Sequence, residues 1–445
     1  MGVLGIIEEA IKRVRPSDSE RAKVRAAVEE VMAKVRDRAK ATPYPLDIKL
    51  VGSAAKDTYV FPPDLDVFIL FPTQVPRSEL ERHGLGIGRD VLGGEERYAE
   101  HPYIHGKFKG FEVDIVPCYA IDDPRHLQSA VDRTPFHTDY ISSHLRLEQH
   151  DQVRLLKQFM KGIGTYSAEA KVQGFSGYLV ELMVLRYGDF ESALKASREW
   201  REGVALSLVD GAGRKFASPM TFYDPVDPER NVASALSLQN MATFIRASGE
   251  FLAKPDLHYF FPRPQTVWSK SRITKEMRKK GTKLVAVQLA KPELTDDNLY
   301  PQVRRTLEGM QSTLAMSGFL VLDRCFQIRA GKVDLMMELQ SDRLPATVRH
   351  LGPPVTSQNS AQFLEKWNEG AVVGPFVENG RWMAIIKRPY TNAKDLLQNE
   401  LHKAGLGSEM KGLEGLRVLS HQQLMRNGPL SSITALLDKT APWER

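Results

Sequence analysis

The sequence predicts an α+β protein that is divided into several domains. The chain has 445 residues, which is more than one hydrophobic core usually organises. Strand-like segments cluster before residue 120, helical periodicity dominates from about 135 to 250, and strands alternate with helices beyond 280. These changes in pattern predict domains over residues 1–146, 147–262 and 263–445.

The composition is that of an ordinary globular protein, with 42% hydrophobic and 26% charged residues. No apolar run is long enough to span a bilayer and the N-terminus has no secretory pattern, so we expect no membrane contact. The only cysteines are Cys118 and Cys325, which excludes a cysteine-rich zinc module and favours a reducing cytoplasm. The net charge of +6 suits a polyanionic partner without requiring one, and both a monomer and a homodimer stay open.

Two segments of the first domain have clear local signals. Ser17 and Glu20 have the spacing of a capping box, and valines follow at helical spacing, which predicts an amphipathic helix to about Lys40. Residues 73–100 are polar and lack a strong period. Their glycine-rich part, 84–88, resembles a phosphate loop, but no strand precedes it and no clear helix start follows. It therefore predicts a flexible linker.

The strands of the first domain carry three aspartates. Asp64 and Asp66 lie in the predicted strand 64–71, where alternate side chains point to the same face. Asp114 lies in the predicted strand 111–116, the second arm of a hairpin, and joins them if the two strands are neighbours. Carboxylates so placed repel each other unless a cation is present, and Mg²⁺ prefers oxygen ligands. The pattern predicts a site for two Mg²⁺ ions that supports in-line phosphoryl transfer.

An isolated Asp-x-Asp pair is more often a cap, a turn or a solvated strand face. Here Gly52-Ser53 ends the preceding strand, 46–52, ten residues before the pair. A tight glycine turn lets backbone N–H groups approach phosphates, and the Ser53 hydroxyl adds a donor. Lys56 in the same loop adds positive charge. Together with Asp114, these residues favour the metal site over the structural alternatives.

The last part of the chain predicts a layer resembling a ferredoxin or RNA-recognition fold, with an insertion. Its predicted elements are a strand at 284–290, a helix at about 300–316, strands at 319–328, 333–340 and 382–388, and a helix from 392. Residues 269–283 are dense in lysine and arginine, which suits RNA phosphates. We expect RNA contacts from Arg278, Lys279, Lys280, Arg304 and Arg305, although any single one of them fits a solvated face equally well.

Longer stretches of sequence carry a family resemblance. The run GSAAKDTYVFPPDLDVFIL resembles the signature of the DNA polymerase beta-like nucleotidyltransferase superfamily. The runs AEHPYIHGKFKGFEVDIVPCY, DRTPFHTDYI, VRLLKQFMKGIGTYSAEAKVQGFSGYLVEL and DPVDPERNVASALS are similar to the archaeal, class I CCA-adding enzymes. The resemblance covers most of the chain and is strongest from about 45 to 240.

The resemblance implies roles for individual residues. Asp64, Asp66 and Asp114 match the metal-binding carboxylates, and Asp114 matches the group that accepts or orients the primer hydroxyl proton. Lys56 stands where many members have arginine, so the charge is kept without the planar fork. The remaining matches are Ser53 to the triphosphate, Thr134 to the sugar, His137, Lys157 and Tyr166 to the nucleotide, Arg230 to the incoming base, and Glu100 and His101 to a mobile loop.

The resemblance also implies an activity. It predicts a catalytic head, a helical nucleotide-binding neck, and a C-terminal body and tail that bind the acceptor arm of tRNA. The implied reaction adds C, C and A to the 3′ end of tRNA from CTP and ATP without a template, and repairs damaged ends. Two alternatives stay open from the sequence, namely another RNA nucleotidyltransferase such as a poly(A) polymerase or an oligoadenylate synthetase-like enzyme, and a catalytically inactive RNA-binding protein.

Overall fold

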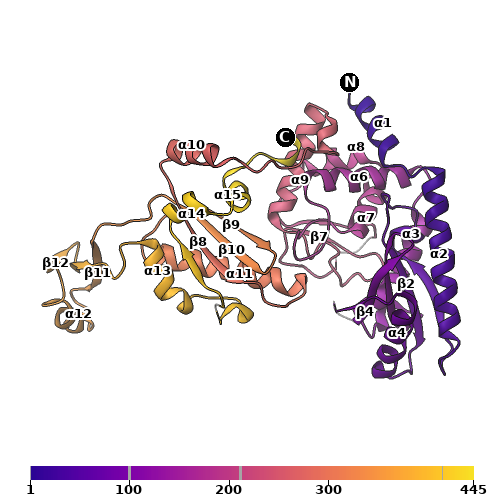
Figure 1. The fold of residues 1–445 in the computed structure, drawn as a ribbon, viewed down its shortest axis with the longest axis horizontal. Helices are drawn as coiled ribbons and strands as arrows, with labels where there is room; N and C mark the ends of the chain where they lie inside the picture. The colour runs from indigo at the N-terminus through magenta and orange to yellow at the C-terminus, as the bar shows by residue number, and fades with distance from the viewer. Residues whose placement is uncertain (1, 99–101, 210–212, 413) are drawn as a thin grey trace. The chain divides into compact units, whose positions relative to one another are not determined.

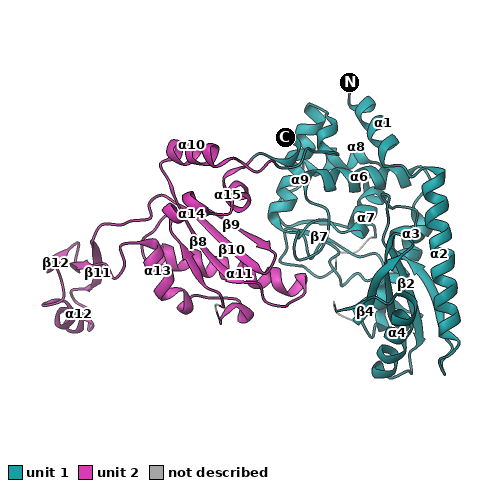
Figure 2. Ribbon diagram, in the orientation of Figure 1, with its two compact units in different colours: residues 1–265, 440–445 teal, residues 266–439 magenta. Residues whose placement is uncertain are grey.

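The computed structural model describes residues 2–98, 102–209, 213–412 and 414–445, which form two compact units (Figures 1 and 2). Unit 1 comprises residues 1–265 and 440–445, and unit 2 comprises residues 266–439. Glu100 and His101 lie outside the described residues. Residues 440–445 belong to unit 1, where the ring of Trp443 stacks on that of Tyr259 with centroids 5.6 Å apart. Unit 2 therefore ends before the predicted limit at residue 445. The predicted boundary after residue 146 lies within unit 1 and stays a prediction. No described helix is long and apolar enough to cross a membrane.

A five-stranded sheet and its helices form the first part of unit 1 (Figure 1). The strands are β1 (Asp47–Val51), β2 (Leu65–Pro72), β3 (Glu95–Tyr98), β4 (Pro102–Phe108) and β5 (Phe111–Ala120), in the order β1-β2-β5-β4-β3. Helices α2 (Asp18–Ala39), the short α3 (Gly52–Ala55) and α4 (Arg77–Leu92) belong to this part, whereas α1 (Val3–Val14) packs against the later helix α6 (Gln149–Ile163). The capping box of Ser17 and Glu20 begins α2, as predicted. The turn of the β4–β5 hairpin falls at Lys109 and Gly110, which both have positive φ.

The sheet has one face packed on helices and another that carries the polar residues. Leu65, Val67 and Ile69 of β2 pack in one core with residues of α2 and α4, and so does Val113 of β5. Because side chains alternate along a strand, the residues between them face the opposite side. This alternation places Asp66 and Asp114 on the face away from α2 and α4.

Helix α4 corrects one prediction, because residues 84–88 form the middle of this helix and are not a linker. The glycines are explained by packing. A Cβ at Gly84 would overlap the ring of Pro117, and a Cβ at Gly88 would lie 2.7 Å from Ile104. Glycine therefore lets α4 lie close against β5 and β4. Because glycine has a low helix propensity, the same residues hide the helix in the sequence.

The second part of unit 1 is mostly helical. Its elements are α5 (Thr134–His144), α6 (Gln149–Ile163), α7 (Gly177–Tyr187), α8 (Phe190–Ser197), β6 (Val204–Leu206), β7 (Met220–Phe222) and α9 (Leu238–Ala253). An aromatic cluster around Phe159 fills the core, with ring centroids of Phe190 and Phe251 at 5.4 and 5.6 Å. Asp151 lies in the first turn of α6, and its carboxylate pairs with the Arg154 guanidinium at 2.8 Å.

Unit 2 contains two antiparallel sheets with helices. Its elements are α10 (Lys270–Lys280), β8 (Lys283–Ala290), α11 (Asp296–Met316), β9 (Val321–Arg329), β10 (Lys332–Leu339), β11 (Thr347–Pro354), α12 (Ser360–Trp367), β12 (Val373–Glu378), β13 (Arg381–Lys387), α13 (Ala393–Glu400), β14 (Arg417–Leu419), α14 (His421–Asn427) and α15 (Leu430–Leu437). The larger sheet has the order β14-β8-β10-β9, and the smaller has the order β11-β13-β12.

The predicted strand at 382–388 pairs differently from the expectation. It corresponds to β13, which lies between β11 and β12 in the smaller sheet and not in the main layer. The fourth strand of the main sheet is β14, whose Val418 pairs with Val287 of β8. With only three residues, β14 is too short to give a periodic signal in the sequence.

Candidate active site

Two aspartates lie side by side on neighbouring strands. Strands β2 and β5 are parallel, and Asp66 is the register partner of Asp114. On its other side, Asp66 is paired with Val51 at the end of β1, immediately before Gly52. Asp64 precedes β2 and is exposed to solvent. The predicted adjacency of the 64–71 and 111–116 strands is therefore confirmed.

The carboxylates carry unbalanced negative charge. Burial, together with the charges of Asp114 and Asp64, raises the pKa of Asp66 to about 7. Burial also raises the pKa of Asp114, although His105 opposes the shift. His105 is the cross-strand partner of Asp114 on β4, and its Nδ1 lies 2.6 Å from Asp114 Oδ1. The negative charge of this cluster favours a cation.

The Gly52-Ser53 turn fits closely against Asp66. Gly52 has φ +70°, and a Cβ at this position would overlap the Asp66 carboxylate, so glycine is required on two grounds. The Gly52 N–H lies 3.3 Å from the Thr138 hydroxyl of α5. Ser53 is the second residue of α3, a single turn that directly follows β1. Backbone donors and the Ser53 hydroxyl thus lie beside the acidic pair.

A buried glutamate holds the two predicted phosphate-binding lysines. Lys56 Nζ lies 2.5 Å from Glu181 Oε2, and Lys157 Nζ lies 3.1 Å from Glu181 Oε1. The Thr58 hydroxyl also donates to Glu181, at 2.5 Å. Burial of Glu181 opposes its ionisation, but the charges of Lys157 and Lys56 outweigh burial and lower its pKa to about 2. Sequence reasoning missed Glu181, although a carboxylate in the otherwise uncharged stretch 177–185 of α7 signals a buried partner.

The loop that carries Lys56 is fixed by α6. The guanidinium of Arg154, which is buried, donates to the Tyr59 carbonyl at 3.0 Å and pairs with Asp57 at 2.6 Å. Lys157 Nζ donates to the Thr58 carbonyl at 3.1 Å. Helix α6 therefore determines the conformation of the loop that follows the Gly52-Ser53 turn.

Tyr166 and Lys161 lie near the acidic cluster. Lys161 Nζ is 5.3 Å from the centre of the Tyr166 ring, and the charge of Asp64 acts on both side chains. The Tyr166 hydroxyl lies close to Gly177, where a Cβ would be 3.0 Å from it. Lys161 is one helical turn after Lys157 and is influenced by the charge of Asp64, whereas Lys157 pairs with Glu181. It is the second residue that sequence reasoning did not place in the site.

His137 and Arg230 meet at one buried carboxylate. His137 Nε2 and Arg230 Nη1 each lie 2.9 Å from Asp224 Oδ2, and the Tyr178 hydroxyl donates to Asp224 Oδ1 at 3.0 Å. Thr134, the first residue of α5, lies one turn before His137, and its carbonyl accepts from Thr138 at 3.0 Å. Asp224 and Tyr178 lie within the runs that carry the family resemblance, but the sequence predicted no role for either residue.

The donor set is compatible with a hard cation. Among the described residues, no group of three His, Cys, Asp or Glu side chains is already arranged around a common metal position. Asp66 and Asp114 are nevertheless register partners, and Asp64 acts electrostatically on both. These three residues offer only carboxylate oxygens, and Mg²⁺ prefers oxygen ligands. A bound cation would relieve the repulsion that raises the Asp66 pKa.

The predicted RNA contacts of unit 2 have different surroundings. Arg278, Lys279 and Lys280 lie exposed at the end of α10, and Lys280 Nζ pairs with the buried Glu338 at 2.7 Å. Arg305 is exposed on α11. Arg304 instead packs over the rings of Tyr300 and Phe326, each at 5.9 Å.

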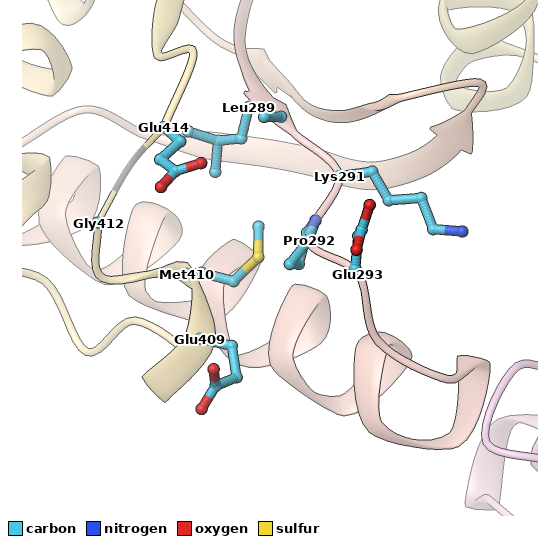
Figure 3. Close-up of a pocket in the computed structure, with 9 residues that line it drawn as sticks. Leu289, Lys291, Pro292, Glu293, Glu409, Met410, Gly412 and Glu414 are labelled. Carbon is cyan, nitrogen blue, oxygen red and sulfur yellow. The ribbon is translucent and has the colours of Figure 1, made fainter.

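A separate cavity in unit 2 contains none of these groups (Figure 3). Its lining includes Lys291, Glu293, Glu409 and Glu414, and the Met410 side chain points into it. The paired aspartates belong to unit 1, so this cavity of unit 2 does not mark the chemistry.

Paired strand carboxylates beside a Gly-Ser turn define a nucleotidyltransferase of the polymerase beta-like class. Three family models match successive parts of the chain: a nucleotidyltransferase domain over residues 29–137, the second domain of tRNA nucleotidyltransferase over 151–261, and the C-terminal domain of the CCA-adding enzyme over 280–420. The chain belongs to the CCA-adding enzymes.

Its relatives support this membership along the whole chain. The CCA-adding enzyme of Methanosarcina acetivorans is 36% identical, covering 94% of this chain and 94% of its own. That of Methanothermobacter thermautotrophicus is 42% identical over 81% of this chain and 82% of its own. That of Haloarcula marismortui is 36% identical over 91% of both chains. The resemblance inferred from the sequence is confirmed.

Proposed function

We propose that this protein completes the 3′ end of tRNA by adding C, C and A from CTP and ATP, without a nucleic acid template. Family membership supports the reaction. The observation that carries the site is the pairing of Asp66 with Asp114 directly beside the Gly52-Ser53 turn. Restoring partly lost ends would use the same site.

The acidic cluster holds the metal and the attacking hydroxyl in this proposal. Asp64, Asp66 and Asp114 would hold Mg²⁺, as two ions. When bound there, the ions would supply charge neutralisation at the triphosphate and favour ionisation of the 3′ hydroxyl of the RNA. Asp114 orients that hydroxyl and accepts its proton, while His105, 2.6 Å away, fixes the orientation of the carboxylate.

The residues around the Gly-Ser turn bind the nucleotide. Ser53 and backbone donors of the turn contact the terminal phosphates, and Lys56 and Lys157 supply positive charge. Tyr166 and His137 contact the nucleotide, and Thr134 contacts its sugar. Arg230 reads the base, because its guanidinium offers several donors in a fixed fork to the acceptors of cytosine and adenine.

Unit 2 binds the RNA in this proposal. The order β14-β8-β10-β9 is the fourth, first, third and second strand of the layer, which supports a ferredoxin-like or RNA-recognition-like fold. Exposed Arg278 and Lys279, with Arg305, contact phosphates of the acceptor arm. We also propose a head at 1–146 and a neck at 147–262, and a cytoplasmic location, which the two free cysteines favour.

The test uses a tRNA that lacks its CCA end. Incubation with CTP and ATP should extend it by three nucleotides and stop, whereas ATP alone should add nothing to that RNA. A tRNA already ending in CC should accept one adenosine. Long adenosine tails, or no magnesium-dependent incorporation at all, would refute the proposed function.

A further inference from the structure

Asp224 is a buried charge at the centre of three polar side chains. It follows β7 and is fully buried. One oxygen, Oδ2, meets His137 and Arg230, and the other, Oδ1, accepts from the Tyr178 hydroxyl. Burial opposes ionisation of Asp224, but the hydrogen bond and charge of His137, the Val226 N–H and Arg230 outweigh it and lower the pKa to about 2. The group is therefore a carboxylate at neutral pH.

The contacts of Asp224 hold the side chains of Arg230 and His137 in place. Arg230 binds it through Nη1, yet the Arg230 side chain keeps 34% of its surface exposed, so part of this side chain stays accessible to a ligand. The His137 ring stacks on Tyr178 with centroids 4.0 Å apart. Because burial lowers the pKa of His137, its ring is neutral at neutral pH, and donation from Nε2 to Asp224 leaves Nδ1 as an acceptor.

We propose that Asp224 is a positioning residue for nucleotide selection, which orients Arg230 and His137 toward the incoming base. This inference rests on the proposed function. A free arginine has many rotamers, and a fork that reads a base must hold one of them. Asp224 supplies that restraint from inside the protein and does not itself touch the nucleotide.

The experiment must distinguish this positioning role from a purely structural role of Asp224. Asp224 Oδ1 also accepts from the Val226 N–H at 3.0 Å, and the Asp224 N–H donates to the Arg230 carbonyl at 3.2 Å. These bonds stabilise the loop 224–230 whatever the nucleotide does. The measurement that separates the two roles is therefore the ratio of kcat/KM for two nucleotides, and not the overall rate.

The test compares Asp224→Asn with the wild type in kcat/KM for CTP and for UTP, on a tRNA that lacks its CCA end. Asparagine keeps the shape but loses the charge, so we expect discrimination to fall on the order of tenfold, the effect of losing one charge-assisted hydrogen bond. The double variant Asp224→Asn/Arg230→Ala should discriminate no worse than Arg230→Ala alone, since Asp224 acts through Arg230.

Two further variants complete the design. Asp227→Asn removes the neighbouring Arg133–Asp227 pair, at 2.8 Å, from the same loop without removing a side-chain bond of Arg230 or His137, and should leave discrimination unchanged. Tyr178→Phe removes one donor to Asp224 without changing a charge. It should lower discrimination in the same direction by a smaller factor, and it decides the question if Asp224→Asn does not fold.

The outcomes separate the two proposals. An equal fall in kcat/KM for both nucleotides, or additive losses in the double variant, would overturn the positioning role while the wild type still adds CCA. A wild type that fails to add CCA would instead refute the proposed function.

Discussion

The nucleotide site of unit 1 and the basic helix α10 of unit 2 hold their positive charges in opposite ways. In unit 1, Lys56 and Lys157 are bound by buried Glu181, and Arg230 by buried Asp224. In α10, Arg278 and Lys279 extend into solvent. A reaction centre needs each charge in one position, whereas a phosphate backbone is recognised by charge density. The difference matches chemistry in the first region and RNA binding in the second.

Lys280 combines features of the two arrangements. It belongs to α10, but its ammonium pairs with Glu338, which is 2% exposed, and the Thr282 hydroxyl donates to the same carboxylate at 2.5 Å. Replacing Lys280 would therefore leave a buried carboxylate short of a partner. Its substitution tests stability as well as RNA binding.

The largest effect is expected from Asp66→Ala. Removing a carboxylate that holds the metal should reduce incorporation on the order of a thousandfold or more, while tRNA binding stays near the wild-type value. Single-turnover incorporation and a filter-binding assay measure the two quantities. Asp47→Ala, an exposed aspartate on β1 of the same sheet, is the control and should retain activity. Near-normal turnover of Asp66→Ala would contradict the metal assignment.

A smaller loss is expected from Gly52→Ala. The added methyl group overlaps the Asp66 carboxylate and is strained at φ +70°, so the turn must shift from its place beside the acidic pair. Incorporation should fall on the order of a hundredfold, with the main loss in kcat. Gly249→Ala in α9, where nothing lies within 4 Å of the new Cβ, should retain full activity. Equal activities of the two variants would show that the close fit at Gly52 is unimportant.

The substitution Glu181→Gln should lower the free energy of unfolding, and the size of this loss should depend on pH. Breaking a buried ion pair from one side costs about 3 kcal/mol of unfolding free energy at neutral pH. Because the folded-state pKa of Glu181 is about 2 against an ordinary 4.5, the wild-type advantage is complete above pH 4.5 and is lost as the pH falls toward 2. Denaturant unfolding at several pH values measures this. Glu202→Gln, an exposed carboxyl of unit 1, should show no such convergence.

The smallest effect is expected from Arg278→Ala/Lys279→Ala. Each lost phosphate contact should flatten the salt dependence of tRNA binding by about 0.7–0.9 in the log–log slope. Incorporation at saturating tRNA should hardly change, because these contacts stabilise ground and transition states alike. Lys23→Ala/Arg25→Ala removes the same charge from the exposed side of α2 and serves as the control. An unchanged slope would identify α10 as a solvated face.

Local signals in the sequence predicted much of the fold and the acidic part of the site. The capping box at Ser17, the hairpin turn at Lys109-Gly110 and the strand positions of Asp66 and Asp114 follow from backbone preferences and alternation. Helix α4 was missed because its glycines serve contacts with Pro117 and Ile104, which no local pattern reveals. Strand β14 was missed because it is only three residues long.

The sequence by itself determined the family, the aspartates and the Gly-Ser turn, because these depend on residue type and short spacing. Only the tertiary structure decided which buried side chains contact the other residues of the site. Glu181 lies 125 residues from Lys56, and Asp224 lies 87 residues from His137. A buried charge finds its partner through packing of distant helices, so the partner leaves no mark in the local sequence. The same reason directs Lys157 toward Glu181, whereas the charge of Asp64 acts on Lys161, one turn later.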